Sequence, residues 1–259
     1  MAPIATTART AVDGVAFDPV TEDAAVAVVI SRARAGAGGF VLTPNASILR
    51  QLRSPEHAAV AARADLVLAD GMPIVWASRI TGTPLPARVT GSSLIWSLTE
   101  AAAREHLPVL LLGGEQGVAE RGAQVLRAAC PGLDVSWHYP PYGFESDPGE
   151  HRAILDAVRA HDARIVFVGL GFPKQERLIL RLRDELPGVW FVACGAALTF
   201  VAGDIARAPR WMQDRGVEWV HRLVHEPGRL ARRYLVEDLP FALGMFTRAA
   251  RLRAARARS

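Results

Sequence analysis

Short apolar runs recur along the chain, and stretches with the periodicity of a helix separate them. The apolar runs are GGFVLT at 38–43, DLVLA at 65–69, PVLLLG at 108–113, RIVFVG at 164–169 and VWFVAC at 189–194. Helical periodicity is clear at 116–129 and at 174–186. This alternation is typical of a parallel sheet, and because the runs are apolar nearly throughout, we expect helices on both faces of that sheet.

The predicted fold is therefore α/β and Rossmann-like, with a mainly parallel sheet and a basic helical C-terminal appendage. We assign residues 1–14 to a flexible N-terminal arm, 15–205 to the Rossmann-like domain and 206–259 to the appendage. A chain of 259 residues that is 50% hydrophobic and 22% charged can bury a full core. This composition excludes wholesale disorder.

Cysteine usage and the N-terminal segment both predict a cytoplasmic protein. Cys130 and Cys194 are far apart in sequence and have no paired spacing, which argues against a disulfide framework and against a zinc ribbon. The segment MAPIATTART has no apolar core behind a basic start, so it does not resemble a cleaved signal peptide. The longest uncharged run, 186–203, contains a proline and three glycines, and we interpret it as a buried strand with its following loop.

Common nucleotide-binding and metal-binding motifs are absent from the sequence. Neither G-x-G-x-x-G nor G-x-x-x-x-G-K-[ST] occurs, and GLGFPK lacks the third glycine of the dinucleotide motif. There is no D-x-D and no close cluster of His, Cys and Asp. We therefore predict no cofactor and no metal site, and any phosphate chemistry would depend on arginine, lysine and backbone N–H groups.

Polar residues follow the first two apolar runs, where a parallel sheet places its ligand-binding edge. Thr43 and Asn45 follow the first run, and Asp70 follows the second. Partial burial would make Asp70 a better general base, whereas the alternative is an Asp-Gly turn that caps the next helix. Thr43 and Asn45 have the same two interpretations, a ligand contact or a turn.

The loop GLGFPKQE at 169–176 follows the fourth run. Its glycines permit a tight turn, and Pro173 suits the first turn of a helix. The loop could present Lys174, Gln175 and backbone N–H groups to an anion at the helix start. Lys174 is the single lysine of the chain.

Positive charge is concentrated in the C-terminal segment. Residues 207–259 contain 12 arginines and 5 acidic residues, a balance of +7, whereas the preceding part of the chain is net negative. Arg229, Arg232 and Arg233 share one helix face. The apolar residues nearby are Leu239, Phe241, Leu243, Met245 and Phe246. This combination suits an anionic membrane surface, a diphosphate substrate or a nucleic acid, in that order, and a solvated helix is the alternative.

Several sequence blocks, taken in order, resemble the WecG/TagA/CpsF glycosyltransferases, which form glycosyltransferase family 26. The blocks are TPNASILRQL, ADLVLADGMPIVW, ARVTGSSL, VGLGFPKQE and AGDIARAPRWMQDRGVEWVHRLVHEPGRLARRY. The resemblance implies transfer of a sugar, with inversion and without a metal, from a UDP-sugar to a polyprenyl-diphosphate-linked saccharide in cell-surface polysaccharide biosynthesis. The implied sugar is an N-acetylhexosamine such as N-acetylmannosamine.

Two further functions stay open at this point. One is a UDP-hexose or UDP-uronic-acid transferase of exopolysaccharide assembly, and the other is a non-catalytic nucleotide-sugar-binding or nucleic-acid-binding module. Where the family commonly has an aspartate in G-x-F-D-F-x-A-G, this chain has Thr199, and its HYPPYGFES segment has a Pro140-Pro141 turn in place of the usual His-Gly-Tyr. These departures leave open the identity of the donor sugar or of the acceptor sugar.

The resemblance also implies roles for individual residues. Asp70 corresponds to the proposed catalytic base, and Thr43 lies beside it. The implied pocket residues are Asn45, Arg88 and Gln175, and the implied diphosphate-binding arginines are Arg222, Arg229 and Arg232. The implied partners are a UDP-sugar, a polyprenyl-diphosphate-linked acceptor and the inner leaflet of the plasma membrane, where the protein would lie peripherally. We expect no nucleic-acid partner, and a homo-oligomer is left open.

Overall fold

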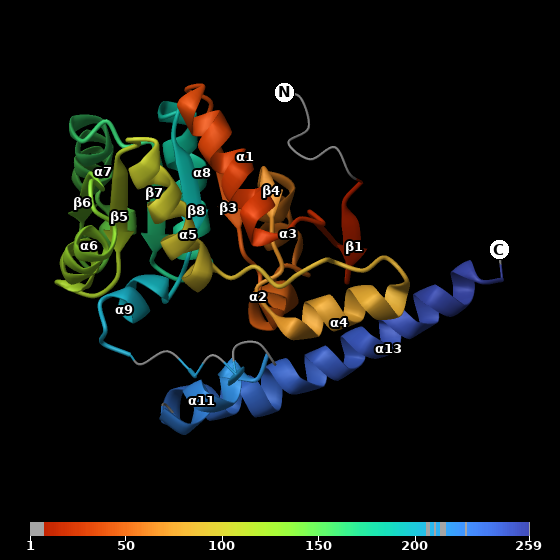
Figure 1. Ribbon diagram of the computed structural model, residues 1–259. Coiled ribbons are helices and arrows are strands. Elements are labelled where there is room, and N and C mark those ends of the chain that lie inside the picture. The colour runs from red at the N-terminus through yellow and green to blue at the C-terminus, as the bar shows by residue number, and fades with distance from the viewer. Residues whose placement is uncertain (1–7, 206–207, 210, 213–215, 226, 259) are drawn as a thin grey trace.

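A six-stranded parallel sheet forms the centre of the computed structural model, with strand order β4-β3-β8-β7-β5-β6 (Figure 1). The structure describes residues 8–205, 208–209, 211–212, 216–225 and 227–258. The strands are β3 (Gly39–Leu42), β4 (Leu66–Val67), β5 (Val109–Gly113), β6 (Val135–His138), β7 (Ile165–Gly169) and β8 (Trp190–Ala193). Every neighbouring pair is parallel, which confirms the predicted α/β fold.

Both faces of the sheet are buried, as the nearly continuous apolar runs predict. In β3, the side chains of Phe40 and Leu42 enter one core cluster and Val41 enters the other. In β8, Phe191 belongs to the first cluster and Trp190 to the second. Successive side chains of a strand point to opposite faces, so an apolar strand requires a cover on each side.

Helices supply both covers. The first cluster is covered by α2 (Ala46–Gln51), α3 (Pro55–Ala62), α4 (Met72–Thr81), α7 (Pro148–Ala160), α8 (Lys174–Glu185) and α13 (Leu239–Arg256). The second is covered by α1 (Glu22–Arg34), α5 (Gly91–Arg104), α6 (Val118–Ala129) and α9 (Ala197–Val201). The carboxyl ends of the parallel strands are left free for the loops that precede α2, α4, α6, α8 and α9.

An antiparallel hairpin precedes the sheet and lies against its edge. Its strands are β1 (Thr10–Val12) and β2 (Val15–Phe17). Asp13 and Gly14 form the turn, both with positive φ, 49° and 87°. The backbone N–H of Asp18 donates to the carbonyl of Val67 in β4 at 2.9 Å, and the N–H of Val67 donates to the Asp18 carboxylate at 2.8 Å. The first strand of the hairpin, Thr10–Val12, lies within the range 1–14 that the sequence analysis assigns to a flexible arm, so these three residues are ordered in the fold.

The C-terminal segment is helical, and its last helix belongs to the main core. The elements are α11 (Glu218–His225), α12 (Pro227–Ala231), the π-helical η2 (Arg232–Asp238) and α13. α13 runs beside α4 (Figure 1), and it buries Phe241, Met245 and Ala249 in the first cluster. Phe246 packs against the same cluster. No helix within the described residues combines the length and the apolar character that a membrane crossing requires.

Candidate active site

Three predicted site residues lie close together where β3 and β4 end. Thr43 directly follows β3, and Asn45 begins the next helix. The backbone N–H of Asp70 donates to the carbonyl of Pro44 at 3.0 Å, which joins the loops after the two strands. Gly71 lies beside Asn45, since a Cβ added to Gly71 would be 3.8 Å from the Asn45 Cα. The fold therefore brings these residues to one edge, as their positions after neighbouring parallel strands predict.

The side chains of Thr43 and Asn45 both make hydrogen bonds within the protein. The buried Thr43 hydroxyl donates to the carbonyl of Ala193 in β8 at 3.0 Å. The Asn45 side-chain oxygen accepts from the N–H of Ile48 at 3.0 Å, so Asn45 is the N-cap of α2. For Asn45, this is the turn interaction that the sequence left as an alternative.

Asp70 does not cap the helix that follows it. The N-cap of α4 is Gly71, and it makes no side-chain capping hydrogen bond. The Asp70 carboxylate instead accepts from the N–H of Gly91, the first residue of α5, at 3.4 Å. A helix N-terminus favours a neighbouring negative charge. The start of α5 packs tightly there, because a Cβ on Gly91 would be 3.0 Å from the Cys194 Cα and 3.4 Å from the Thr43 hydroxyl oxygen.

Gln175 lies between the loops that follow β7 and β8, with its side chain turned away from solvent. The residue is 2% exposed. Its Oε1 accepts from the backbone N–H groups of Gly171 at 3.2 Å and Gly195 at 3.1 Å, and its Nε2 donates to Glu176 Oε1 at 2.8 Å. The structure thus uses the Gln175 amide to join two loops, whereas the resemblance implies a substrate contact.

Glu176 is a site residue that the sequence analysis does not identify. It is 0% exposed, and burial raises its pKa to about 7. Carboxyl groups whose pKa burial shifts strongly are common in functional sites. Its position after Gln175 in the loop motif is the only signal in the sequence, and that signal does not reveal burial.

Lys174 lies toward the opposite edge of the sheet. Its Nζ is 2.6 Å from Glu145 Oε1 and 5.4 Å from the centroid of the Tyr142 ring. The hydrogen bond to Glu145 raises the pKa of Lys174. Both partners belong to the HYPPYGFES segment after β6, so Lys174 ties the loop after β7 to the loop after β6. Neither the ion pair nor the ring contact involves Asp70 or Thr43.

Several glycines pack closely where β5 and β7 end, between Lys174 and the group formed by Thr43, Asn45 and Asp70. The chain leaves β7 toward β8 and leaves β5 toward β6, so the direction of winding reverses between these neighbouring strands. The N–H of Gly114 donates to the carbonyl of Gly169 at 2.8 Å. A Cβ on Gly169 would be 2.6 Å from Leu198 Cδ1 and 2.9 Å from the Gly195 carbonyl oxygen, which leaves no room for a side chain.

Arg88 connects the site to the start of the appendage. The N–H of Val89 donates to the carbonyl of Ala69 at 2.9 Å, which places Arg88 beside the residues leading to Asp70. Arg88 Nη1 is 3.4 Å from Glu218 Oε2 at the beginning of α11, and both side chains are mostly buried. This predicted pocket arginine therefore contacts the appendage.

The appendage is also fastened to α2, the helix that Asn45 caps. Arg50 of α2 forms ion pairs with Glu237 at 2.6 Å and Asp238 at 3.5 Å. Arg233 of η2 donates from Nε to the Ser47 hydroxyl at 3.0 Å. These contacts fix η2 on a helix that begins in the site.

Among the predicted diphosphate-binding arginines, Arg232 has a side chain that the structure describes. This side chain is 87% exposed, and its Nε is 4.0 Å from Glu237. The side chains of Arg222 and Arg229 lie outside the described residues. Arg233, their neighbour on the same predicted face, contacts α2 through Ser47 and is partly covered, with 40% of its side chain exposed.

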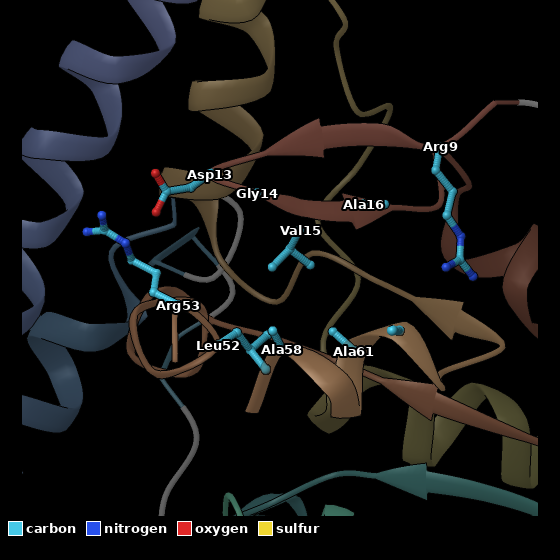
Figure 2. A pocket seen from close by; sticks show the side chains of 10 residues that line it. Arg9, Asp13, Gly14, Val15, Ala16, Leu52, Arg53, Ala58 and Ala61 are labelled. Carbon is cyan, nitrogen blue, oxygen red and sulfur yellow. The ribbon is translucent and has the colours of Figure 1, made fainter. Parts of the chain in front are cut away.

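A cavity of about 440 Å³ lies elsewhere, between the hairpin and α3 (Figure 2). Its lining residues are Arg9, Asp13, Gly14, Val15, Ala16, Leu52, Arg53, Ala58, Ala61 and Ala62. Two charged groups of the lining are paired within the protein, Arg9 with Asp18 at 3.0 Å and Asp13 with Arg248 at 2.5 Å. No predicted site residue lines the cavity, so the candidate active site lies outside it.

Comparison with known proteins identifies the family of the chain. A sequence profile described as the Glycosyl transferase WecG/TagA/CpsF family matches residues 10–255. A relative from Bacillus spizizenii, named N-acetylglucosaminyldiphosphoundecaprenol N-acetyl-beta-D-mannosaminyltransferase, is 29% identical over 196 residues, which cover 75% of this chain and 74% of the relative. Within the described residues, no three His, Cys, Asp or Glu side chains form a group that could hold a metal ion. Because the profile match spans nearly the whole chain, the protein is a glycosyltransferase that belongs to the WecG/TagA/CpsF family.

Proposed function

We propose that this glycosyltransferase moves an N-acetylhexosamine, such as N-acetylmannosamine, from a UDP-sugar to a polyprenyl-diphosphate-linked saccharide. The name of the Bacillus spizizenii relative supports both the sugar and the class of acceptor. The observation that carries the proposal is the convergence of Thr43, Asn45 and Asp70 at the carboxyl ends of β3 and β4. This edge is where open parallel sheets bind their ligands.

In the proposed reaction, Asp70 is the general base. Its carboxylate accepts the proton of an acceptor hydroxyl while that oxygen forms a bond to the anomeric carbon of the donor sugar. The bond from the anomeric carbon to the β-phosphate oxygen breaks, and UDP leaves with the electron pair. Attack opposite the leaving group inverts the anomeric centre. The hydrogen bond from Gly91 holds the Asp70 carboxylate at the start of α5 during this step.

Positive groups around the edge suit the charge that develops on UDP. Arg88 lies beside the strand that leads to Asp70, and Lys174 lies between the loops after β6 and β7. We place the donor diphosphate near the glycine-crowded ends of β5 and β7, where backbone N–H groups can approach phosphate oxygens closely. Guanidinium, ammonium and amide donors would then supply the stabilisation that a metal ion gives other transferases.

Membrane docking by the appendage is the finer part of the proposal. Leu235, Leu239 and Leu243, spaced four residues apart, are all exposed, and we call them the outer stripe. Residues 251–258 at the end of α13 are exposed as well and contain four arginines. An exposed apolar stripe beside basic residues suits peripheral binding to an anionic leaflet. On sequence alone, Phe241, Met245 and Phe246 group with Leu239 and Leu243, but the three residues pack against the core. The proposed membrane contact therefore consists of the outer stripe without them.

A transfer assay tests the proposal directly. The purified protein is incubated with UDP-N-acetylmannosamine, UDP-N-acetylglucosamine, UDP-glucose or UDP-glucuronic acid and a short-chain polyprenyl-diphosphate N-acetylglucosamine, and UDP release is followed together with the lipid product. We expect product with a UDP-N-acetylhexosamine, and we expect it to persist in EDTA. Product formed only with a hexose or uronic acid donor, or only with added divalent metal, would contradict the corresponding part of the proposal.

A further inference from the structure

One side-chain oxygen holds two loops of the site in place. Gln175 Oε1 accepts from the N–H of Gly171 in the loop after β7 and from the N–H of Gly195 in the loop after β8. The backbone N–H of Gln175 in turn donates to the Gly171 carbonyl at 3.0 Å. The first loop is therefore bonded to Gln175 in both directions, and the second loop is bonded through the same oxygen.

This arrangement works in only one orientation of the Gln175 amide. If the amide were rotated by half a turn, its NH₂ group would face two N–H donors and no hydrogen bond would form. With Oε1 facing the loops, Nε2 needs an acceptor inside the protein. Glu176 Oε1 is that acceptor, at 2.8 Å, and Glu176 Oε2 has no hydrogen-bond partner among the described residues.

The loop after β8 transmits this constraint to the base. Ala193 accepts the hydrogen bond of the Thr43 hydroxyl, and the backbone N–H of Cys194 donates to the Val168 carbonyl at 3.0 Å. The start of α5 at Gly91 packs against Cys194 and also donates to Asp70. A shift of the loop would therefore move the surroundings of Asp70.

We propose that Glu176 is a positioning residue, which fixes the orientation of the Gln175 amide and thereby holds the loops after β7 and β8 against the site. Its part in turnover rests on the proposed function, whereas its hold on the loops does not. Glu176 acts through Gln175 and touches no substrate. Burial of its carboxyl group agrees with this role, because a buried acceptor has few alternative partners.

Hydrogen–deuterium exchange of the full chain tests the hold on the loops without any substrate. Glu176→Met keeps the volume of the side chain but removes the acceptor, and Glu176→Gln keeps an acceptor oxygen. We expect exchange in peptides covering 169–175 and 193–197 to be about tenfold faster in Glu176→Met and close to wild type in Glu176→Gln, since one lost hydrogen bond changes a local equilibrium by about this factor. The peptide covering 113–117 and the variant Glu185→Met, which changes an exposed acid of α8, are the controls.

A swapped pair separates positioning from substrate contact. Assayed well above about pH 7, where Glu176 is ionised, Gln175→Glu alone places two carboxylates together, and we expect kcat/KM to fall on the order of 10²-fold, the cost of a misplaced reacting geometry. The double variant Gln175→Glu with Glu176→Gln restores the pattern, because the carboxylate introduced at position 175 accepts from both loops and the amide introduced at position 176 donates to it. We expect the double variant to regain at least about tenfold of the loss, mainly in kcat, while a substrate contact of the Gln175 amide would leave it inactive.

Two results would overturn the proposal: equal exchange at both loops in Glu176→Met and Glu176→Gln, or a swapped pair as impaired as Gln175→Glu in both exchange and turnover. If Glu176→Met also accelerates exchange at 113–117, the substitution has destabilised the whole domain. The comparison of the swapped pair with Gln175→Glu then tests the proposal. Absence of transfer by the wild-type protein would count against the proposed function alone, because the exchange measurements need no donor or acceptor.

Discussion

Asp70 combines a partly exposed side chain with a fixed position. Its backbone N–H is bonded to Pro44, and its carboxylate accepts from Gly91. Asp70→Asn keeps an oxygen for Gly91 but cannot take a proton. We expect kcat to fall by about 10² to 10⁴, the range typical for removal of a general base, while UDP binding and the unfolding free energy stay near wild type. Steady-state kinetics, calorimetric titration with UDP and urea denaturation measure the three quantities.

The matched control for this substitution is Asp23→Asn, which changes an exposed carboxylate in the first turn of α1. It should turn over like wild type. If Asp70→Asn also retained wild-type kcat, the base would be another group and Asp70 would serve only to bind the start of α5.

Glu176 gives the protein a specific dependence of stability on pH. Burial raises its pKa from 4.5 to about 7 in the folded state. Between these values the folded protein binds more protons than the unfolded chain, so the unfolding free energy falls as pH rises through this window. The loss is complete above about pH 7 and amounts to about 3 kcal/mol.

Glu176→Gln should lack this loss because its amide does not titrate. Urea denaturation at about pH 4.5 and about pH 7.5 measures the change in each protein, and we expect the fall in unfolding free energy to be about 3 kcal/mol smaller in the variant. Groups such as Asp238, whose pKa burial also raises, are present in both proteins and cancel in this comparison. Parallel curves for the two proteins would show that the pKa of Glu176 is the same in the folded and unfolded states, and would contradict the raised value.

Among the helices and strands, the sequence predicts those that have a clear local signal. Five apolar runs correspond to β3, β4, β5, β7 and β8, because strands buried on both faces must be apolar throughout. The apolar runs do not include β6, since Val135–His138 is an edge strand whose side chains are mostly only half-buried or exposed. The hairpin β1–β2 also goes unpredicted, although its Asp13-Gly14 pair, flanked by alternating residues, is a strong turn signal.

In the candidate site, too, positions with a local sequence signal are predictable, and contacts between distant parts of the chain are not. Thr43, Asn45 and Asp70 could be placed from their positions after parallel strands. The roles of Gln175 and Glu176 depend on contacts with Gly195, twenty residues further along, and no local pattern encodes those contacts. The exposure of the tail arginines is likewise decided by packing, because η2 lies on α2 so that Arg233 is partly covered, with 40% of its side chain exposed, whereas 87% of the Arg232 side chain is exposed.

The outer stripe lies on η2 and α13, and its proposed contact with lipid can be tested by removing its apolar surface. In the double variant Leu239→Gln with Leu243→Gln, two exposed leucines lose their apolar surface without a change in the core. Burial of a leucine side chain is worth about 1.5 to 3 kcal/mol, so even partial insertion of both predicts a loss of at least about tenfold in vesicle binding. Sedimentation with vesicles of phosphatidylglycerol and phosphatidylethanolamine measures it.

Val125→Gln is the control for that experiment, because Val125 of α6 is similarly exposed but lies on the opposite cover of the sheet. Its binding should equal that of wild type. Equal binding by the double variant would show that the outer stripe does not enter the lipid and would leave the arginines as the sole contact.

At the scale of the whole molecule, the appendage and the α/β domain share one core. α13 contributes Phe241 and Met245 to the cluster that also contains α4 and α8, and Arg248 reaches the hairpin turn at Asp13. Arg50 and Arg88 add ion pairs between the site region and the appendage. Movement of the appendage relative to the site would therefore break core contacts as well as surface ones, and we expect the two parts to unfold in one transition.

Two truncations separate the structural role of α13 from its role at a membrane. Removal of residues 239–259 takes Phe241 and Met245 out of the core, and at about 1.5 to 3 kcal/mol per buried side chain the unfolding free energy should fall by about 3 to 6 kcal/mol. Urea denaturation measures this loss, and unchanged stability would contradict the shared core.

The shorter truncation, of residues 251–259, takes away only exposed side chains among those described. We expect it to change the unfolding free energy by less than about 0.5 kcal/mol, because surface residues contribute little to stability. It should nevertheless weaken binding to anionic vesicles by more than about tenfold, since each lost arginine contributes about 1 kcal/mol near such a surface. Unchanged vesicle binding after this truncation would confine membrane contact to the outer stripe.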